Sequence, residues 1–423
     1  MLKRFRISNF KSLLNIEFRP VGFNLLIGPN NAGKTNLCSA LRFLGLTSMN
    51  TLERAAYNAV GESWSLSNVY VSDRTLEMEV DCVISHQNEQ LEFNYRLKIL
   101  ATPTLKSGKQ SLQVAEEFLT LTGGGFSQTT LLENRGGQVK LLHEGRFLSR
   151  GGPEAPYPKT TAPSEAPRLS QLHNPPAESP YVETTAPPDA TMLSRLYDLE
   201  TNQRANLFKR YLQLWFYYNL NPQALRSPEV LREESPVIRH DGANLSHVLF
   251  RLHNEKPRIE KKIIDAVRAL EPKLDLFSYS SPDPQSVYLF LEDQDGNRFS
   301  PQSMSDGTLR FLALVYLIIT AENYKEFSPF APLIFFEEPE NGLYVGYLKP
   351  LLERMDASGA HGQFIFTSHS PYFIDLFDTN LDGLHLLKPG KPSSVLVKPD
   401  ADKIRKLLDE MPLGEMHYRE LLG

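Results

Sequence analysis

The sequence predicts an α/β fold with an antiparallel β lobe and a helical insertion. An apolar strand at 24–27 runs through a glycine-rich turn into a helix at 35–46. Residues 69–142 instead alternate polar and apolar side chains, as half-solvated strands of an antiparallel sheet do. The last third of the chain alternates helices with strands, among them strands at 332–337 and 363–367. These three patterns favour an α/β core into which the β lobe and a helical segment are inserted.

Composition limits the class of protein. The chain has 423 residues, 41% of them hydrophobic and 22% charged, and its formal net charge is −5. This balance is typical of a globular protein and excludes a strongly basic surface. Two cysteines cannot form a disulfide scaffold, and no apolar run reaches the roughly 18 residues of a membrane span. We therefore expect a cytoplasmic protein without a signal peptide and without membrane association.

The chain divides into four expected parts. The first, at 1–150, is an α/β lobe that carries the β lobe. A proline-rich flexible loop at 151–190, a helical insertion at 191–275 and a second α/β lobe at 276–423 follow it. The loop is expected because its proline-rich composition cannot bury enough surface to offset the entropy of ordering it. The insertion is expected to hold a buried helix at 206–218 and a helical stretch at 245–270 that is broken at Pro257. The stretch at 245–270 does not sustain the heptads of a coiled coil.

A glycine-rich loop carries the strongest chemical signal. Residues 28–35, Gly-Pro-Asn-Asn-Ala-Gly-Lys-Thr, match G-x-x-x-x-G-K-[ST] between a predicted strand and a predicted helix. Glycines let consecutive N–H groups point inward, and the helix presents its positive N-terminal end to a phosphate. Lys34 would bring its charge to the β- and γ-phosphate oxygens, and the Thr35 hydroxyl would ligate Mg²⁺. A chance glycine-rich turn would not be flanked in this way.

Two carboxylates follow a second buried strand. Glu337 and Glu338 end the apolar run at 333–336, which is the arrangement of a Walker B strand. Glu337 would hold Mg²⁺ through water, and Glu338 would orient or deprotonate the attacking water. The alternative is a strand end with solvated charges. Because no Asn-Lys-x-Asp motif for reading guanine is present, a GTPase is not expected.

Two weaker features flank that strand. Ser305-Asp306-Gly307 opens a strongly apolar helix, and His369 follows the strand at 363–367. Each alone has an ordinary explanation, a helix N-cap in the first case and a structural histidine in the second. Their order is informative, because a phosphate loop, a long insertion, a small polar helix start, an acidic strand and a histidine follow one another in ABC-type ATPase heads.

In this ordered set the chain resembles the SMC/RecF/OLD-like group of ABC ATPases. Residues 7–13 are similar to the first strand of that group, 28–36 to its Walker A motif, and 304–310 to its signature motif. Residues 337–343 are similar to its Walker B motif with the D-loop, and 367–370 to its switch histidine. The resemblance implies a P-loop NTPase fold of the ABC head type, ATP and Mg²⁺ as cofactors, and ATP hydrolysis.

The resemblance also implies roles for individual residues. It implies a homodimer in which two ATP molecules lie between the Walker A motif of one subunit and the signature of the other, with a higher oligomer left open. The catalytic residues would be Lys34, Glu338 and His369, and the metal ligands Thr35 and Glu337. The nucleotide contacts would be Lys11, Ser12, Asn30, Asn31, Ala32, Gly33, Lys34, Thr35, Asn36, Ser305, Asp306 and Gly307.

The chain departs from the group at three points. Glu337 stands where an aspartate is usual, Tyr344 replaces a histidine that often follows Asn-Gly-Leu, and no glutamine can be assigned to the Q-loop. The short insertion predicts no coiled coil, and the 54 residues after His369 predict no Toprim nuclease within the chain.

Two functions remain open. The first is an ATP-dependent dimeric switch that controls a separate effector, a nuclease or toxin, in antiviral defence or genome maintenance. The alternative is a RecF-like DNA-repair clamp that binds DNA directly. A transporter subunit is disfavoured because the Leu-Ser-Gly-Gly-Gln signature is absent. Nucleic acid is left open as a partner, although the basic clusters at 3–6 and 256–262 are more typical of solvated faces than of a phosphate track.

Overall fold

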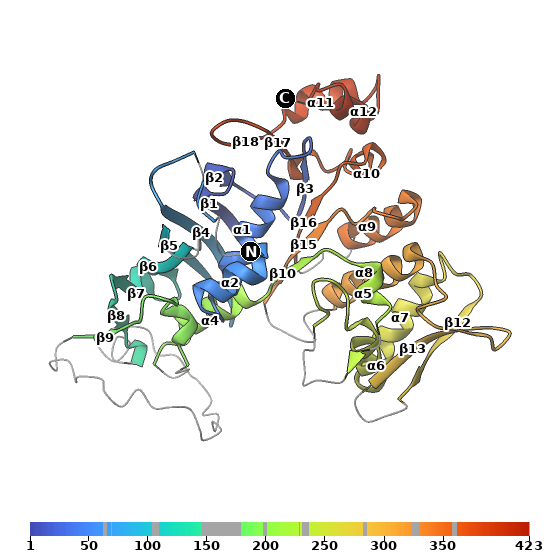
Figure 1. The fold of residues 1–423 in the computed structure, drawn as a ribbon, viewed down its shortest axis with the longest axis horizontal. Coiled ribbons are helices and arrows are strands. Elements are labelled where there is room, and N and C mark those ends of the chain that lie inside the picture. Colours follow the sequence, from blue (N-terminus) through green and yellow to red (C-terminus); the bar gives the residue numbers. More distant parts are fainter. Residues whose placement is uncertain are drawn as a thin grey trace. The chain divides into compact units, whose positions relative to one another are not determined.

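The computed structural model contains two compact units, each built from segments far apart in sequence (Figure 1). The structure describes residues 1–61, 66–68, 70–103, 110–145, 179–197, 201–227, 229–230, 237–281, 286–323, 330–357 and 362–422. Unit 1 comprises Met1–Arg19, Ser39–Leu214 and Gly390–Ser394, and unit 2 comprises Pro20–Cys38, Trp215–Pro389 and Val395–Gly423. This division differs from the four consecutive parts expected from the sequence, because each unit is assembled from three segments that are not consecutive in the chain.

Unit 1 is built on an eight-stranded antiparallel sheet with strand order β2-β1-β4-β5-β6-β7-β8-β9. Its strands are β1 (Leu2–Phe10), β2 (Leu13–Phe18), β4 (Thr75–His86), β5 (Glu89–Pro103), β6 (Gln110–Gly123), β7 (Phe126–Arg135), β8 (Gln138–Leu142) and β9 (Tyr181–Thr185). Its helices are α2 (Leu52–Val60), the 3-10 turn η1 (Leu193–Arg195) and α4 (Gln203–Gln213), with the end of α1 (Lys34–Thr47). The expected antiparallel β lobe is confirmed.

Part of the expected proline-rich loop belongs to this sheet. Residues 146–178 lie outside the described residues, but Tyr181–Thr185 form β9 and pair with β8, with Leu141 opposite Val182. The prediction of a loop up to residue 190 is therefore wrong for this segment. Composition describes the average of a segment, whereas β9 gains its backbone hydrogen bonds from a neighbouring strand that composition does not reveal.

The predicted helix at 206–218 is also wrong at its C-terminal end. Helix α4 ends at Gln213, and Trp215–Tyr218 form a strand, β10, of unit 2. An apolar run is ambiguous between a buried helix and a buried strand, and four consecutive aromatic residues favour a strand. The break at Pro257 is confirmed, because α6 (Leu245–Glu255) and α7 (Pro257–Val267) are separate helices.

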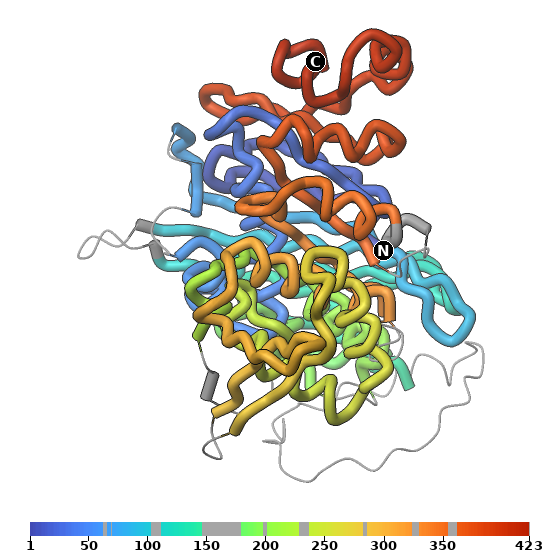
Figure 2. The backbone as a smooth tube through the Cα atoms, turned by 90° about the vertical axis from the view of Figure 1, so that its right-hand side faces the viewer, coloured from blue at the N-terminus to red at the C-terminus, as the bar shows by residue number. Residues whose placement is uncertain are grey.

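Unit 2 is built on a six-stranded sheet with strand order β10-β15-β16-β3-β17-β18, parallel except for β18. Its strands are β10 (Trp215–Tyr218), β15 (Leu333–Glu337), β16 (Gln363–Thr367), β3 (Phe23–Ile27), β17 (Leu384–Lys388) and β18 (Val395–Val397). A smaller sheet contains β11 (Glu229–Val230), β12 (Leu274–Ser280), β13 (Ser286–Asp293) and β14 (Arg298–Phe299). Figure 2 shows β12 and β13 beside the helices of this unit.

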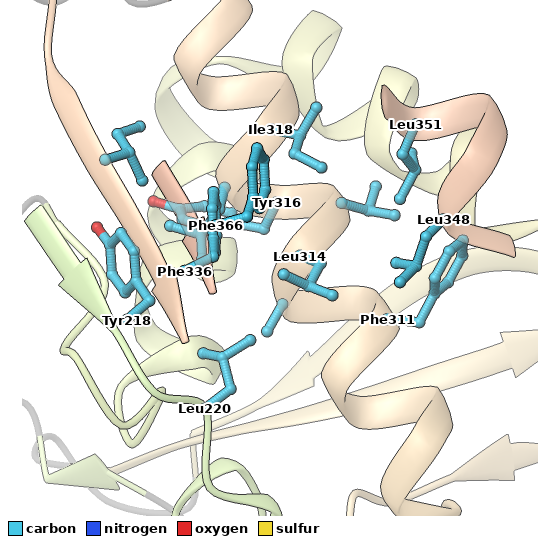
Figure 3. Packing of buried hydrophobic residues seen from close by; sticks show 14 of the residues in the cluster. Tyr218, Leu220, Phe311, Leu314, Tyr316, Ile318, Phe336, Leu348, Leu351 and Phe366 are labelled. Atoms are coloured by element: carbon cyan, nitrogen blue, oxygen red, sulfur yellow. The ribbon is translucent and has the colours of Figure 1, made fainter. Parts of the chain in front are cut away.

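The remaining helices also belong to unit 2. They are α5 (Pro222–Leu225), α6, α7, α8 (Asp306–Glu322), α9 (Leu348–Ala357), α10 (Pro371–Asp375), α11 (Ala401–Leu407) and α12 (Leu413–Tyr418), with the 3-10 turns η3 (Val345–Tyr347) and η4 (Leu381–Gly383). Helix α8 supplies the centre of the core, where its side chains meet aromatic residues of the parallel strands such as Phe336 and Phe366 (Figure 3). Burial of this apolar surface stabilises unit 2 and fixes the sheet edge that carries the polar residues. None of the described helices is long and apolar enough to cross a membrane.

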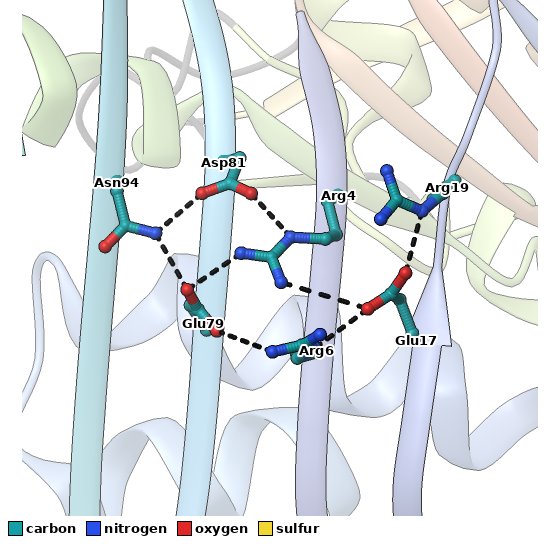
Figure 4. A network of polar contacts seen from close by, with 7 residues as sticks. All are labelled: Arg4, Arg6, Glu17, Arg19, Glu79, Asp81 and Asn94. Carbon is teal, nitrogen blue, oxygen red and sulfur yellow. Dashed lines mark hydrogen bonds and ion pairs between the residues drawn. The ribbon is translucent and has the colours of Figure 1, made fainter. Parts of the chain in front are cut away.

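The basic cluster at 3–6 is paired with carboxylates on the sheet of unit 1. Arg4 lies 2.8 Å from Glu79 and 2.5 Å from Asp81, and Arg6 lies 2.8 Å from Glu17 (Figure 4). Hydrogen bonds from Arg19 and then Arg6 lower the pKa of Glu17. The arginines of this cluster therefore neutralise acidic neighbours rather than forming a track of unpaired positive charge.

Candidate nucleotide-binding site

The parallel sheet of unit 2 brings three predicted motifs to one edge. Strand β3 leads into the loop at 28–35, β15 ends at Glu337, and β16 is followed by His369. Strands β15 and β3 both pair in parallel with β16, so the carboxyl ends of all three lie at the same edge. In open α/β sheets this edge is where ligands bind.

The loop at 28–35 is a backbone cradle that needs its glycines. Gly28 has φ +144°, and a Cβ there would lie only 2.0 Å from the carbonyl oxygen of Leu387. Gly33 has φ +100°, and Asn31 is left-handed with φ +63°. These conformations curl the chain tightly before α1 begins at Lys34, so that its N-terminal N–H groups face the loop. A loop of this shape fits a phosphate group.

Lys34 is buried within the cradle. Its Nζ donates to the carbonyl oxygens of Gly28 at 2.7 Å and Pro29 at 3.1 Å, and lies 3.5 Å from Nδ1 of His369. Burial lowers the pKa of Lys34 to about 8, against the attraction of Glu338. Because backbone carbonyls solvate this ammonium only partly, a phosphate would give it a stronger partner.

The Glu337 carboxylate is held by three donors. Thr35 Oγ1 donates to its Oε1 at 2.5 Å, while the Tyr217 hydroxyl and Asn219 Nδ2, the latter at 3.0 Å, donate to its Oε2. A hydroxyl and a carboxylate are the hard oxygen ligands that Mg²⁺ prefers beside phosphate oxygens. The chemistry of Thr35 and Glu337 therefore suits a magnesium ion, and their role as its ligands stays a prediction.

Glu338 adopts a conformation that turns its side chain toward His369. Its φ is +46°, and its backbone N–H donates to the Thr367 carbonyl at 3.0 Å. Its Oε1 lies 3.4 Å from Nε2 of His369, and its Oε2 accepts from Asn341 at 2.6 Å. Burial and then the charge of Lys34 lower the pKa of His369, while Glu338 opposes the change. Such a strained residue, common at functional sites, holds a carboxylate where it can receive a proton.

The signature residues form a separate structure at the start of α8. Ser305 caps the helix by accepting from the Thr308 N–H at 3.0 Å, and Asp306 pairs with Arg226 at 2.6 Å. A Cβ on Gly307 would lie 2.8 Å from the carbonyl oxygen of Gly342, so the segment around Gly342 packs against the start of α8. None of the contacts among the described residues joins these residues to the loop at 28–35 of the same chain. Their role on the nucleotide of a second subunit stays a prediction.

The other predicted contacts are placed as follows. Lys11 and Ser12 belong to unit 1, where the Ser394 hydroxyl donates to Ser12 Oγ at 2.9 Å. Their contact with a nucleotide in unit 2 stays a prediction. In the loop itself, Asn30 and Asn31 are exposed, Ala32 and Gly33 are buried, and Asn36 is half-buried.

Three residues near this edge were missed by the sequence analysis. Tyr217 and Asn219 come from β10 and the residue following it, a segment that was predicted to be helical. His417 comes from α12, which packs on α10 through a 2.8 Å hydrogen bond from the Gly414 N–H to Asp375. Burial and then the charges of Lys34 and His369 lower the pKa of His417. Of these three residues, only Tyr217 and Asn219 had a signal in the sequence, the run of aromatic residues at 215–218 that favours a β-strand.

The chain matches one protein-family model over most of its length. Residues 23–139 and 197–375 match the family described as "AAA domain, putative AbiEii toxin, Type IV TA system". Among curated proteins, the DNA replication and repair protein RecF of Prosthecochloris aestuarii (strain DSM 271 / SK 413) is 33% identical over 102 residues. These residues are 22% of this chain and 28% of RecF, so the chain spans less than a third of that relative's length.

Solved structures of SMC heads share the fold. The SMC head bound to the C-winged helix domain of ScpA has a TM-score of 0.51 at 12% identity and covers 95% of this chain and 99% of its own. The Smc head domain with an extended coiled coil, bound to the C-terminal domain of ScpA derived from Pyrococcus furiosus, has a TM-score of 0.50 at 10% identity. It covers 97% of this chain and 98% of its own. The chain belongs to this AAA-domain family and is an ABC ATPase of the SMC/RecF-like type.

Proposed function

We propose that this chain hydrolyses ATP with Mg²⁺ and that the closure of two copies around the nucleotide is its working step. The observation that carries the proposal is the assembly of Lys34, Thr35, Glu337, Glu338 and His369 at one edge of the parallel sheet. These residues lie at or just beyond the carboxyl ends of three strands that are distant in sequence. A purely structural cluster would not require a cradle, a buried lysine and a strained carboxylate together.

Each side chain has a distinct role in this proposal. ATP with Mg²⁺, when bound, supplies the phosphoryl group that is transferred to water and part of the charge neutralisation. Lys34 exchanges its carbonyl partners for phosphate oxygens, and Thr35 with Glu337 provides the oxygen ligands of the metal. Glu338 orients the attacking water and takes its proton, and His369 fixes the position of the Glu338 carboxylate from 3.4 Å.

The signature residues act on the nucleotide of a second copy in this proposal. Ser305 and Gly307 lie at the positive N-terminal end of α8, a helix of 17 residues that is suited to hold the terminal phosphate of a neighbour's nucleotide. Arg310 donates to the carbonyl oxygen of Asn341, whose side chain donates to Glu338. Through these contacts, a movement of the start of α8 on closure of the dimer would change the position of the Glu338 carboxylate.

The biological role that we favour is control of a separate effector, a nuclease or toxin, in antiviral defence or genome maintenance. The family description refers to a toxin and a type IV TA system, which supports a role in antiviral defence that involves a toxic effector. The structural relatives were solved with a domain of a partner protein bound to the head, which supports partner binding by this fold. A nucleotide-dependent dimer would then switch the effector on or off.

A RecF-like clamp that binds DNA directly is the second candidate, and the RecF match is the observation that favours it. Gel-shift assays with and without ATP separate the two proposals. Salt-sensitive, ATP-dependent binding to DNA by the purified chain would favour the clamp. A second polypeptide that purifies with the chain and is released by ATP hydrolysis would favour the effector switch.

The ATPase proposal is tested with purified wild-type chain. We expect phosphate release that depends on Mg²⁺ and stops with EDTA, and a dimer in the presence of a non-hydrolysable ATP analogue. Absence of ATP binding by calorimetry, in a folded preparation, would reject the nucleotide site itself.

A further inference from the structure

Tyr217 lies beside the strand that delivers the proposed metal ligand. Strand β10 pairs in parallel with β15, and in that register Tyr217 is opposite Phe335, two residues before Glu337. Side chains alternate between the faces of a strand, so Tyr217 and Glu337 share one face. Tyr218 and Phe336 occupy the other face and pack into the core (Figure 3).

Both oxygens of Glu337 are oriented by donors from outside its own strand. Tyr217 and Asn219 donate to Oε2 from the β10 side, and Thr35 donates to Oε1 from the start of α1. The Thr35 hydroxyl is the group that would share the metal, so it cannot orient the carboxylate independently of the metal. The hydrogen bonds from Tyr217 and Asn219 can orient the carboxylate without the metal, because their acceptor is Oε2, which Thr35 does not contact.

A glutamate at this position needs such an anchor more than an aspartate does. Glu337 carries one more rotatable bond than the aspartate that is usual in ABC ATPases, and a freely rotating carboxylate must lose that freedom when it binds a ligand. An aspartate on the same backbone would also end one methylene short of the position at which Tyr217 contacts Glu337.

We propose that Tyr217 is a positioning residue, whose hydroxyl fixes the Glu337 carboxylate in the orientation that receives Mg²⁺ and thereby compensates for the longer side chain. The proposal rests on the proposed function, because the metal is expected here only with a nucleotide. In this proposal Tyr217 contacts neither nucleotide nor metal. It acts through Glu337, and its contribution should therefore disappear when Glu337 no longer reaches it.

The test is Tyr217→Phe, which removes the hydroxyl and keeps the ring. The binding of a non-hydrolysable ATP analogue is measured by calorimetry, once in EDTA and once in saturating Mg²⁺. We expect unchanged affinity in EDTA and a loss of roughly tenfold or more in Mg²⁺, the scale of one hydrogen bond to a charged group. The melting temperature of the nucleotide-free protein should fall by no more than a few degrees, the scale of one lost hydrogen bond. Tyr218→Phe, on the core face of the same strand, is the matched control and should not change the effect of Mg²⁺.

The double variant separates positioning from general disturbance. In a Glu337→Asp background, Tyr217→Phe should cause no further loss of Mg²⁺-dependent affinity, because the shorter side chain does not reach the Tyr217 hydroxyl. Equal losses in both backgrounds would overturn the proposal. So would lower affinity in EDTA, or a melting temperature lowered far beyond the loss of one hydrogen bond, since either indicates a structural role for Tyr217.

The proposed function can fail separately from this inference. If the wild-type chain binds the analogue no better with Mg²⁺ than with EDTA, the magnesium-nucleotide site is rejected. If the wild type gains affinity from Mg²⁺ and Tyr217→Phe gains equally, only the positioning role of Tyr217 is rejected.

Discussion

The charged cluster on the sheet of unit 1 is balanced by its own members, whereas the buried lysine of unit 2 is not. Arg4 contacts two carboxylates at hydrogen-bonding distance, and Arg6 contacts a third (Figure 4). Among the described residues Lys34 forms no ion pair and rests on backbone carbonyls instead. The acids nearest to it are held by tyrosine, threonine, asparagine and histidine side chains. The arginines of unit 1 therefore have carboxylate partners without any ligand. The ammonium of Lys34 has only backbone carbonyls, so its charge is available to an anionic ligand.

The largest expected effect follows from removing that charge. Lys34→Ala should lower ATP affinity by about 3 kcal/mol, or roughly 100-fold, because the phosphates lose a desolvated cationic partner. Calorimetry measures this loss, and Arg6→Ala in unit 1 is the control that should leave ATP affinity unchanged. If Lys34→Ala bound ATP as tightly as the wild type, the charge of Lys34 would not serve a ligand, and the proposed difference between the two clusters would be wrong.

Removing the proposed catalytic base should separate binding from turnover. Glu338→Gln keeps the shape of the side chain and loses its basicity, so hydrolysis should slow by roughly 100-fold or more while ATP still binds. Phosphate release measures the rate, and light scattering should detect a dimer that accumulates with ATP. Normal turnover would move the base to another residue.

The lowered pKa of Lys34 predicts a pH dependence of binding. Free Lys34 loses its proton near pH 8, and bound phosphates would raise its pKa again. Above pH 8 the complex must therefore take up a proton, and ATP affinity should fall by up to about tenfold per pH unit. Calorimetry in two buffers of different ionisation heat detects the uptake. His369 and His417, whose pKa values are lowered, are neutral throughout this window. Lys34→Arg, which stays charged, should abolish the uptake.

The signature is tested by a substitution that spares the cradle. Ser305→Arg places a long cation at the N-terminal end of α8, so it should block closure of two subunits while each monomer still binds ATP. Hydrolysis should fall with little change in the affinity for the analogue. Wild-type hydrolysis in this variant would argue against a role of the signature in a second subunit.

The smallest effect is expected in unit 1. Arg6→Ala removes an exposed partner of Glu17, and such surface pairs contribute at most about 1 kcal/mol to stability. Denaturant unfolding in low and high salt measures this contribution, which should shrink as salt rises. A loss of several kcal/mol would show that this network is more than a set of surface pairs.

Some features of this protein were determined by the sequence alone because they depend on local physics. The cradle at 28–35 needs glycine at Gly28 and Gly33, where φ is positive, and the alternating pattern of β4 and β5 predicts a half-solvated antiparallel sheet. Both rest on backbone sterics and side-chain periodicity over a few residues. The same holds for Glu337 and Glu338 at the end of an apolar strand.

Other features were decided only by the tertiary structure. Residues 181–185 become β9, the run at 215–218 becomes β10, and Tyr217 with Asn219 meets Glu337 more than a hundred residues away. The C-terminal helix likewise brings His417 into the electrostatic environment of Lys34. Each depends on which strand or helix lies alongside, and pairing between distant segments is set by the free energy of the whole fold rather than by any local pattern.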